Sequence, residues 1–159
     1  MILINKSASA PLLRAVISLL STGFAEENIP VYDVVPAEAE LPFVVVRAMS
    51  EVEDSTKTDY GSRVQIEISN FAEARESKTV QERSSAVISM LEESDLDVEG
   101  FYLLSAELVR NDCAETDVDN VWSGAITVEF SVQESEDTTT PEAVTPQEDE
   151  DDGEEVLEG

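Results

Sequence analysis

Alternation of apolar and polar residues is clearest late in the chain, over residues 121–132. Apolar or small residues fall at every second position there: Trp122, Gly124, Ile126, Val128, Phe130 and Val132. The same pattern runs over residues 63–71 and 101–110, with these apolar members: Val64, Ile66, Ile68, Leu104, Ala106 and Leu108. Because successive side chains of a strand point to opposite faces, the pattern predicts three half-buried antiparallel strands. The isolated Gly124 indicates a bulge or a site of close packing within its strand.

Two other segments carry apolar residues at the spacing of an α-helix. The first begins near Ser9, whose hydroxyl is suited to capping, has Pro11 in its first turn and ends near Gly23. The second begins near Ser77 and ends near Glu93. Each segment has one apolar face, so we expect two amphipathic helices that lie on a sheet.

The stretch VYDVVPAEAELPFVVV, residues 31–46, combines strand and turn signals densely. We expect one strand over residues 29–34 and another over 43–46, with Pro36 and Pro42 bounding a polar bend between them. The second strand has consecutive apolar residues, which is typical of a strand covered on both faces.

The order of helices and strands predicts an α+β fold. Its sheet is mainly antiparallel, with about four strands and with two helices packed on one face. The chain has 159 residues, which suits one such domain over residues 1–132 followed by an extension. That extension, residues 133–159, is rich in acidic residues, Thr and Pro, and we expect it to be disordered. Val156 and Leu157 form a lone apolar pair within this extension. They could form a short docking motif, but the favoured interpretation is that the pair has no role.

The polar segment from Ser50 to Ser62 is predicted to be a long loop between two strands. Loops longer than about 12 residues in a compact domain usually carry function or are disordered, so this loop is the first candidate for contacts with other proteins. Arg47 and Arg63 flank it and are candidates for ion pairs between subunits; the alternative is that they balance acidic neighbours locally. The candidate contact residues are Arg47, Glu51, Glu53, Asp54, Lys57, Asp59, Tyr60 and Arg63.

The chain carries a net charge of -27, with 36 acidic and 9 basic residues. Such a surface repels nucleic-acid phosphates and anionic lipids, which argues against specific DNA binding and against membrane binding. No apolar run approaches the ~20 residues of a membrane span. The charge fits either an ordinary solvated surface or adaptation to high salt.

The residues that most enzymes use for catalysis are missing from this sequence. It has no histidine, so Ser-His, Cys-His and zinc-His sites are excluded within the chain. Its one cysteine, Cys113, cannot form an intrachain disulfide, and no phosphate-binding or dinucleotide-binding motif is present. We therefore expect no enzymatic activity, no cofactor and no metal.

The acidic segment 111–120 has the composition of a cation site, with Asp112, Glu115, Asp117 and Asp119. It lacks the glycine and the bidentate glutamate of a calcium loop, so a solvated hairpin turn is the favoured interpretation.

With its elements placed, the chain resembles the tail-completion or tail-terminator proteins of long-tailed phages and related archaeal tailed viruses. The resemblance begins with the apolar helix over residues 12–20 and continues through a segment of the form VYDxVPxxxxxPYVVV. The matching residues are Val31, Tyr32, Asp33, Val35, Pro36, Pro42, Phe43, Val44, Val45 and Val46. It covers roughly residues 10–132 and leaves out the acidic extension.

The resemblance implies a virion structural protein of the tail or neck, as in a siphovirus, assembled in the host cytoplasm. Such a protein forms a homo-oligomeric ring, typically a hexamer, that caps the tail tube and joins it to the head-side connector. Genome DNA would pass through the lumen without specific binding, which the acidic charge fits.

Two alternatives stay open at this point. One is another neck ring protein, such as a head-closure protein or connector adaptor. The other is an acidic DNA mimic that inhibits a nucleic-acid enzyme, which would not need to form a ring.

Overall fold

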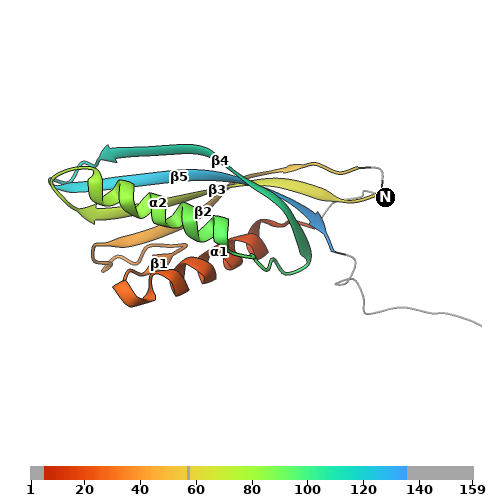
Figure 1. Cartoon of the computed structure of the whole chain (residues 1–159), viewed down its shortest axis with the longest axis horizontal. Coiled ribbons are helices and arrows are strands. Elements are labelled where there is room, and N and C mark those ends of the chain that lie inside the picture. The colour runs from red at the N-terminus through yellow and green to blue at the C-terminus, as the bar shows by residue number, and fades with distance from the viewer. Residues whose placement is uncertain (1–5, 57, 136–159) are drawn as a thin grey trace, which may run out of the picture.

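The computed structural model describes residues 6–56 and 58–135. Figure 1 shows two long helices beside an elongated sheet. The elements in chain order are α1 (Ser9–Gly23), the 3-10 helix η1 (Ala25–Glu27), β1 (Val31–Tyr32), β2 (Phe43–Glu53), β3 (Gly61–Glu73), α2 (Lys78–Glu93), β4 (Phe101–Glu115) and β5 (Val121–Glu134). The two helices therefore lie where the apolar periodicity predicts them.

The strands form one sheet in the order β1-β2-β3-β5-β4. The short β1 pairs in parallel with β2, through Val31 beside Val44 and Tyr32 beside Val45. The other three pairings are antiparallel. The α+β class and the mainly antiparallel sheet are confirmed. Strand β1 lies within the strand expected over residues 29–34 but has only two residues, and the sheet has five strands where we expected about four.

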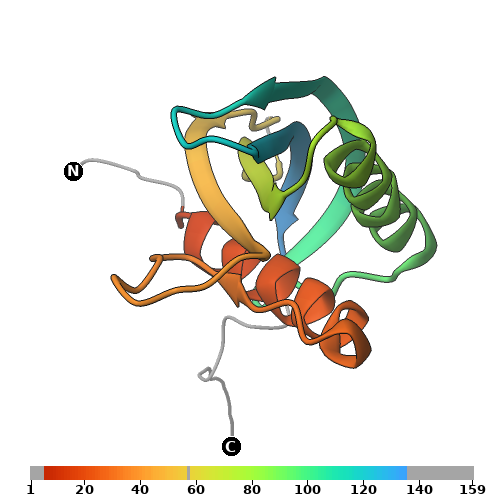
Figure 2. The same ribbon diagram turned by 90° about the vertical axis from the view of Figure 1, so that its left-hand side faces the viewer.

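Both helices contribute to one core on a single face of the sheet. Figure 2 shows a curved sheet with α1 on the side of β1 and α2 on the side of β4. The helices bury Leu12, Val16, Leu20, Val80 and Val87. The strands contribute alternate positions of β2, β3 and β5: Val44, Val46, Val64, Ile66, Ile68, Ile126, Val128, Phe130 and Val132. Burial of these side chains is the main stabilising contribution to the fold.

A polar contact joins α2 to the sheet within this core. Asn70 of β3 is buried, and its Nδ2 lies 3.3 Å from the Val80 carbonyl oxygen, 3.1 Å from Ser84 Oγ and 3.2 Å from the Gly124 carbonyl oxygen. A Cβ on Gly124 would lie 2.9 Å from Ser84 Oγ. Gly124 therefore marks a site of close packing between strand and helix. Close packing was one of the two predictions for this residue, and a bulge was the other.

The prediction for β4 is wrong in one respect. Leu104 and Leu108 were expected to face the core, but they are 61% and 49% exposed. The register of β4 against β5 shifts between Leu103 and Ser105 and again between Leu108 and Arg110, so strict alternation is lost. Helix α2 lies mainly over β3 and β5, which leaves the outer part of β4 uncovered.

The last strand runs past residue 132, where we expect the domain to end. Strand β5 continues to Glu134, two residues beyond the expected boundary at 132. Residues 136–159, where we expect disorder and where Val156 and Leu157 lie, are outside the described residues.

Candidate functional site

The loop between β2 and β3 is shorter than predicted. Strand β2 continues to Glu53 and β3 begins at Gly61, so the connection is residues 54–60 rather than 50–62. Polar residues in these strand extensions pair in register, for example Ser50 with Gln65 and Glu53 with Ser62. The sequence did not show this because the extensions lack apolar alternation. Backbone pairing extends the hairpin beyond its apolar part.

Glu51 has a structural task that sequence reasoning did not identify. Its side chain lies on the helix-facing side of β2 and reaches the start of α1. Glu51 Oε2 accepts a hydrogen bond from the Ala8 backbone N–H at 2.9 Å, and Oε1 accepts hydrogen bonds from the hydroxyls of Ser7 and Ser9, each at 2.7 Å. Ser9 was expected to cap the helix, yet the cap position is Ala8, which has no side-chain cap of its own. A carboxylate from a distant strand takes that role.

The pKa of Glu51 reflects these contacts. Partial burial acts to raise the pKa, because it disfavours the charged form. Hydrogen bonds from the Ala8 backbone and from the side chains of Ser7, Ser9 and Ser62 outweigh that effect, and the pKa lies below its ordinary value of 4.5. The carboxylate is therefore held in its charged form next to the positive end of the α1 dipole.

The two candidate arginines make ion pairs within the chain. Arg47 Nη2 lies 2.6 Å from Glu67 Oε1. Arg63 lies between two carboxylates, with Nε 3.6 Å from Asp54 Oδ2 and Nη1 3.8 Å from Glu129 Oε2. These contacts fit the alternative that the arginines balance acidic neighbours locally, and exposed pairs of this kind add little stability.

The remaining candidates do not form one cluster with Glu51. Glu53 and Tyr60 are exposed, and Asp59 accepts a hydrogen bond from the Thr58 hydroxyl within the loop. Lys57 lies outside the described residues. A role for these residues in contacts with other proteins stays a prediction.

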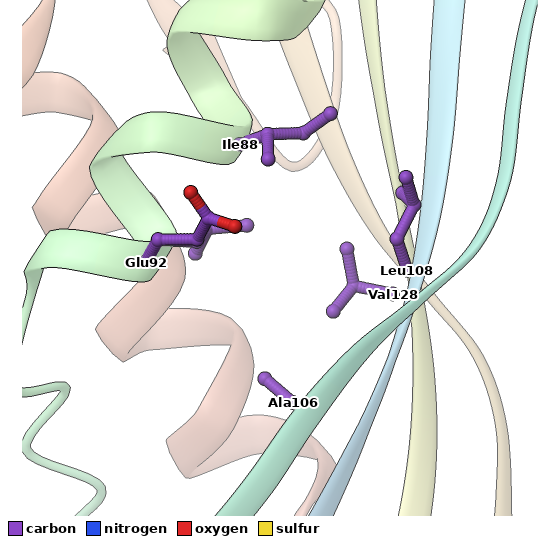
Figure 3. Close-up of a pocket in the computed structure, with 6 residues that line it drawn as sticks. Ile88, Glu92, Ala106, Leu108 and Val128 are labelled. Atoms are coloured by element: carbon purple, nitrogen blue, oxygen red, sulfur yellow. The ribbon is translucent and has the colours of Figure 1, made fainter.

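An apolar pocket opens between α2 and β4. Figure 3 shows Ile88 and Glu92 on the helix facing Ala106, Leu108 and Val128 on the strands. Leu91 also lines the pocket, whose volume is about 110 Å³. Five of its six lining residues are apolar. The pocket exists because α2 does not cover β4, so the helix-facing side chains of that strand have space in front of them.

Among the described residues, strand β4 is also an edge of the sheet along its whole length. The stretch from Phe101 to Ala106, FYLLSA, carries no charge, although 28% of the chain is charged. Among the exposed large apolar residues of β4 are Tyr102, Leu104, Leu108 and Val109. An uncharged stretch on an edge strand is prone to pair with another chain, so this part of β4 is a candidate interface that sequence reasoning missed. The uncharged run was the signal that could have revealed it.

The opposite edge of the sheet is only partly covered. Strand β1 pairs with β2 at Val44 and Val45. Within the described part of the chain, residues 46–53 of β2 therefore have no strand on that side. Met49 and Val52 on this edge are 49% and 51% exposed. The sheet thus ends in two different edges that both expose apolar side chains.

The acidic turn is shorter than expected and does not gather its carboxylates. Strand β4 extends to Glu115, so the turn spans residues 116–120 rather than 111–120. Asp112 lies in the strand and pairs with Arg110 at 2.9 Å. Over residues 6–56 and 58–135, no group of three acidic or cysteine side chains is placed to hold a metal ion. None of the helices in these ranges is long and apolar enough to cross a membrane.

Comparisons with known proteins agree with the fold. The chain is similar to a chain in a solved structure of the virion of a native gene transfer agent (GTA) particle, with 21% sequence identity and a TM-score of 0.67. The match covers 81% of this chain and 99% of that one. No curated protein matches the sequence.

The sequence model of one family, tail completion protein gp17, matches residues 14–133. This range contains all five strands almost completely, together with α2 and most of α1. The resemblance stated from the residues is thereby confirmed. The chain belongs to the tail completion protein gp17 family, which places it among the structural proteins of a virion.

Proposed function

We propose that this protein is a tail terminator, which forms a closed ring that caps the tail tube and joins it to the head-side connector. The ring contains several identical copies, with six as the expected number. The family and the virion neighbour support a structural tail protein. The ring, its copy number and its position on the tube are our proposal.

One observation carries the proposal: over the residues that the structure describes, the sheet has two different free edges. A closed ring needs each subunit to present two unlike surfaces that meet head to tail. Here β4 forms one edge, and residues 46–53 of β2 lie at the other. Both edges expose apolar residues, which is unusual on a chain of net charge -27.

The charge of the chain fits a passage for DNA. A ring of such subunits has an acidic surface, and like charge keeps DNA from adhering to the lumen. The same charge makes assembly depend on ionic strength. Subunits repel one another in low salt, whereas at 1 M salt the screening length falls to about 3 Å.

The first experiment is to measure the solution mass by light scattering. The full chain is examined in low salt and in molar salt, with and without the tail-tube protein of the same virion. We expect a monomer in low salt and a ring of defined mass in high salt or on the tube protein. A strict monomer under all four conditions contradicts the proposal and favours an acidic DNA mimic.

The structure to which the ring binds distinguishes a tail terminator from another neck ring. A terminator ring should bind the end of the assembled tube and stop its growth, which electron microscopy of tube lengths can measure. A ring that leaves tube length unchanged and binds only the head-side connector is a head-closure or adaptor ring.

A further inference from the structure

We propose that the free edge of β2 in one copy adds to β4 of the next copy, with Arg47 beside Glu107 and Met49 in the pocket between α2 and β4. This inference rests on the proposed ring and specifies the contact between its subunits. The occupant of the α2–β4 pocket is therefore a second copy of this chain.

Charge is the first argument for this contact. The register of β4 against β5 places Glu107 directly opposite Glu129, and like charges in that position destabilise a strand pair. Glu129 lies near Arg63, whereas Glu107 takes part in no ion pair within the described part of the chain. A cation from another chain would offset the repulsion between Glu107 and Glu129.

Arg47 is the cation that the other edge presents. It lies on the free part of β2, on the sheet face away from the helices, and Glu107 lies on the same face of β4. The Arg47 side chain is 62% exposed even though it contacts Glu67. Since a guanidinium has five N–H donors, it can contact both carboxylates.

Strand direction is the second argument. Three successive antiparallel pairings make β2 and β4 run in opposite directions. In a ring whose axis follows the strands, each β4 therefore meets the next β2 in the antiparallel sense. Antiparallel strands need no change in backbone conformation to pair, so the sheet continues from copy to copy.

The third argument is the apolar content of the two edges. With Arg47 beside Glu107, antiparallel pairing places Ala48 beside Ala106, which lines the α2–β4 pocket. The register of β2 against β3 shifts between Ala48 and Ser50, so Met49 is the extra residue of a β-bulge and does not follow the strict alternation of faces. We place its side chain at the mouth of that pocket. An unbranched thioether side chain fills irregular apolar space well. The uncharged stretch FYLLSA then faces the remainder of the β2 edge, where Val52 is exposed.

A designed disulfide tests the contact directly. Cys113 is the only cysteine in the sequence, so Cys113→Ser removes the native thiol. Arg47→Cys and Glu107→Cys are then combined in this background. Neighbouring antiparallel strands hold paired Cα atoms about 4.5–5.5 Å apart, which suits a disulfide. The matched control replaces Glu107→Cys by Val118→Cys, in the turn after β4.

We expect oxidation in molar salt to give a covalent ladder that ends at the mass of the closed ring, and no ladder from the control. A ring by light scattering without a ladder overturns this inference but leaves the proposed function standing. Absence of any ring for the native chain, with or without tube protein, overturns the proposed function and this inference together.

A second pair of variants does not depend on disulfide geometry. Met49→Asp should weaken subunit association on the order of tenfold or more, because it places a charge in an apolar pocket. Val118→Asp, also an exposed apolar position, should change association less than about twofold. Both should melt near the native temperature by circular dichroism. If Met49→Asp and Val118→Asp associate with equal strength, the proposed contact between β2 and β4 is wrong.

Discussion

The Glu51 carboxylate of β2 accepts a hydrogen bond from the Ala8 backbone N–H at the start of α1, at 2.9 Å. The two residues are 43 positions apart in sequence. A strand thereby supplies the cap that the helix lacks in its own sequence, and the N-terminus of α1 is fixed to the β2–β3 hairpin. The contact that caps α1 therefore also holds this part of β2, at one edge of the sheet, against the start of the helix.

We predict that Glu51→Ala lowers the free energy of unfolding by about 1 kcal/mol at neutral pH, the usual cost of losing a helix cap. Urea denaturation followed by circular dichroism measures it. Glu53→Ala is the control, because it removes the same charge from an exposed position two residues away. Equal effects of the two substitutions would show that net charge, and not the cap, decides the result.

The lowered pKa of Glu51 predicts a specific dependence on pH. A carboxyl group whose pKa is lower in the folded state stabilises the protein fully above its unfolded pKa, near 4.5. That contribution is lost as the pH falls through the folded pKa. The stability difference between the native chain and Glu51→Gln should therefore be constant from pH 7 to about pH 5.5 and shrink at lower pH. A difference that grows on acidification would contradict the assigned hydrogen bonds.

Gly124 should not tolerate a side chain. An alanine Cβ would lie 2.9 Å from Ser84 Oγ and 3.0 Å from both Asn70 Nδ2 and the Val80 carbonyl oxygen. Two of these three atoms belong to α2. We predict that Gly124→Ala destabilises the fold by about 1–3 kcal/mol, as overpacking does. Thermal unfolding measures the loss, and Ser123→Ala, whose side chain points to the other face, should change it by less than about 0.5 kcal/mol.

Relief of the crowding at Gly124 provides a stricter check. Ser84→Ala removes the nearest of the three atoms, so the double variant Gly124→Ala, Ser84→Ala should lose less stability than the two single losses combined. Simple additivity would mean that the helix moves away instead of resisting the new methyl group.

Much of the fold could be predicted because its apolar periodicity is strong. Strands β3 and β5 bury alternate residues, and the helices bury one face each, so sequence pattern and structure coincide there. Strand β4 shows the same pattern but is exposed. Alternation reports which residues share a face, whereas coverage of that face depends on where α2 lies, and this is set by tertiary contacts such as Asn70 with Ser84.

The candidate site was harder to predict for a related reason. The polar ends of β2 and β3 pair through their backbones, which side-chain patterns do not report, so Glu51 was assigned to a loop. The cap at Ala8 joins distant parts of the chain and has no local sequence signal. The acidic composition of 111–120 left a cation site as one interpretation beside the favoured solvated turn. Asp112 and Glu115 lie in β4, which the sequence pattern had ended at residue 110. In each case the three-dimensional pairing decided the outcome.

The exposed inner face of β4 leads to a final prediction that separates folding from assembly. Leu108 and Val128 line the same pocket and lie opposite each other on β4 and β5, yet they are 49% and 4% exposed. Val128→Ser should destabilise the monomer by about 2–4 kcal/mol, because it leaves a cavity and an unpaired hydroxyl in the core. Leu108→Ser should cost less than about 1 kcal/mol, since that side chain remains half in water.

The effects of these two substitutions on assembly should have the opposite order, with Leu108→Ser weakening the association of folded subunits more than Val128→Ser. In molar salt, Leu108→Ser should shift the mass distribution towards monomer at concentrations where it remains folded, which sedimentation velocity can follow. Destabilisation of the monomer by Leu108→Ser as large as that by Val128→Ser would mean that β4 belongs to the core. Native-like assembly of a folded Leu108→Ser chain would mean that the pocket between α2 and β4 contributes nothing to the ring.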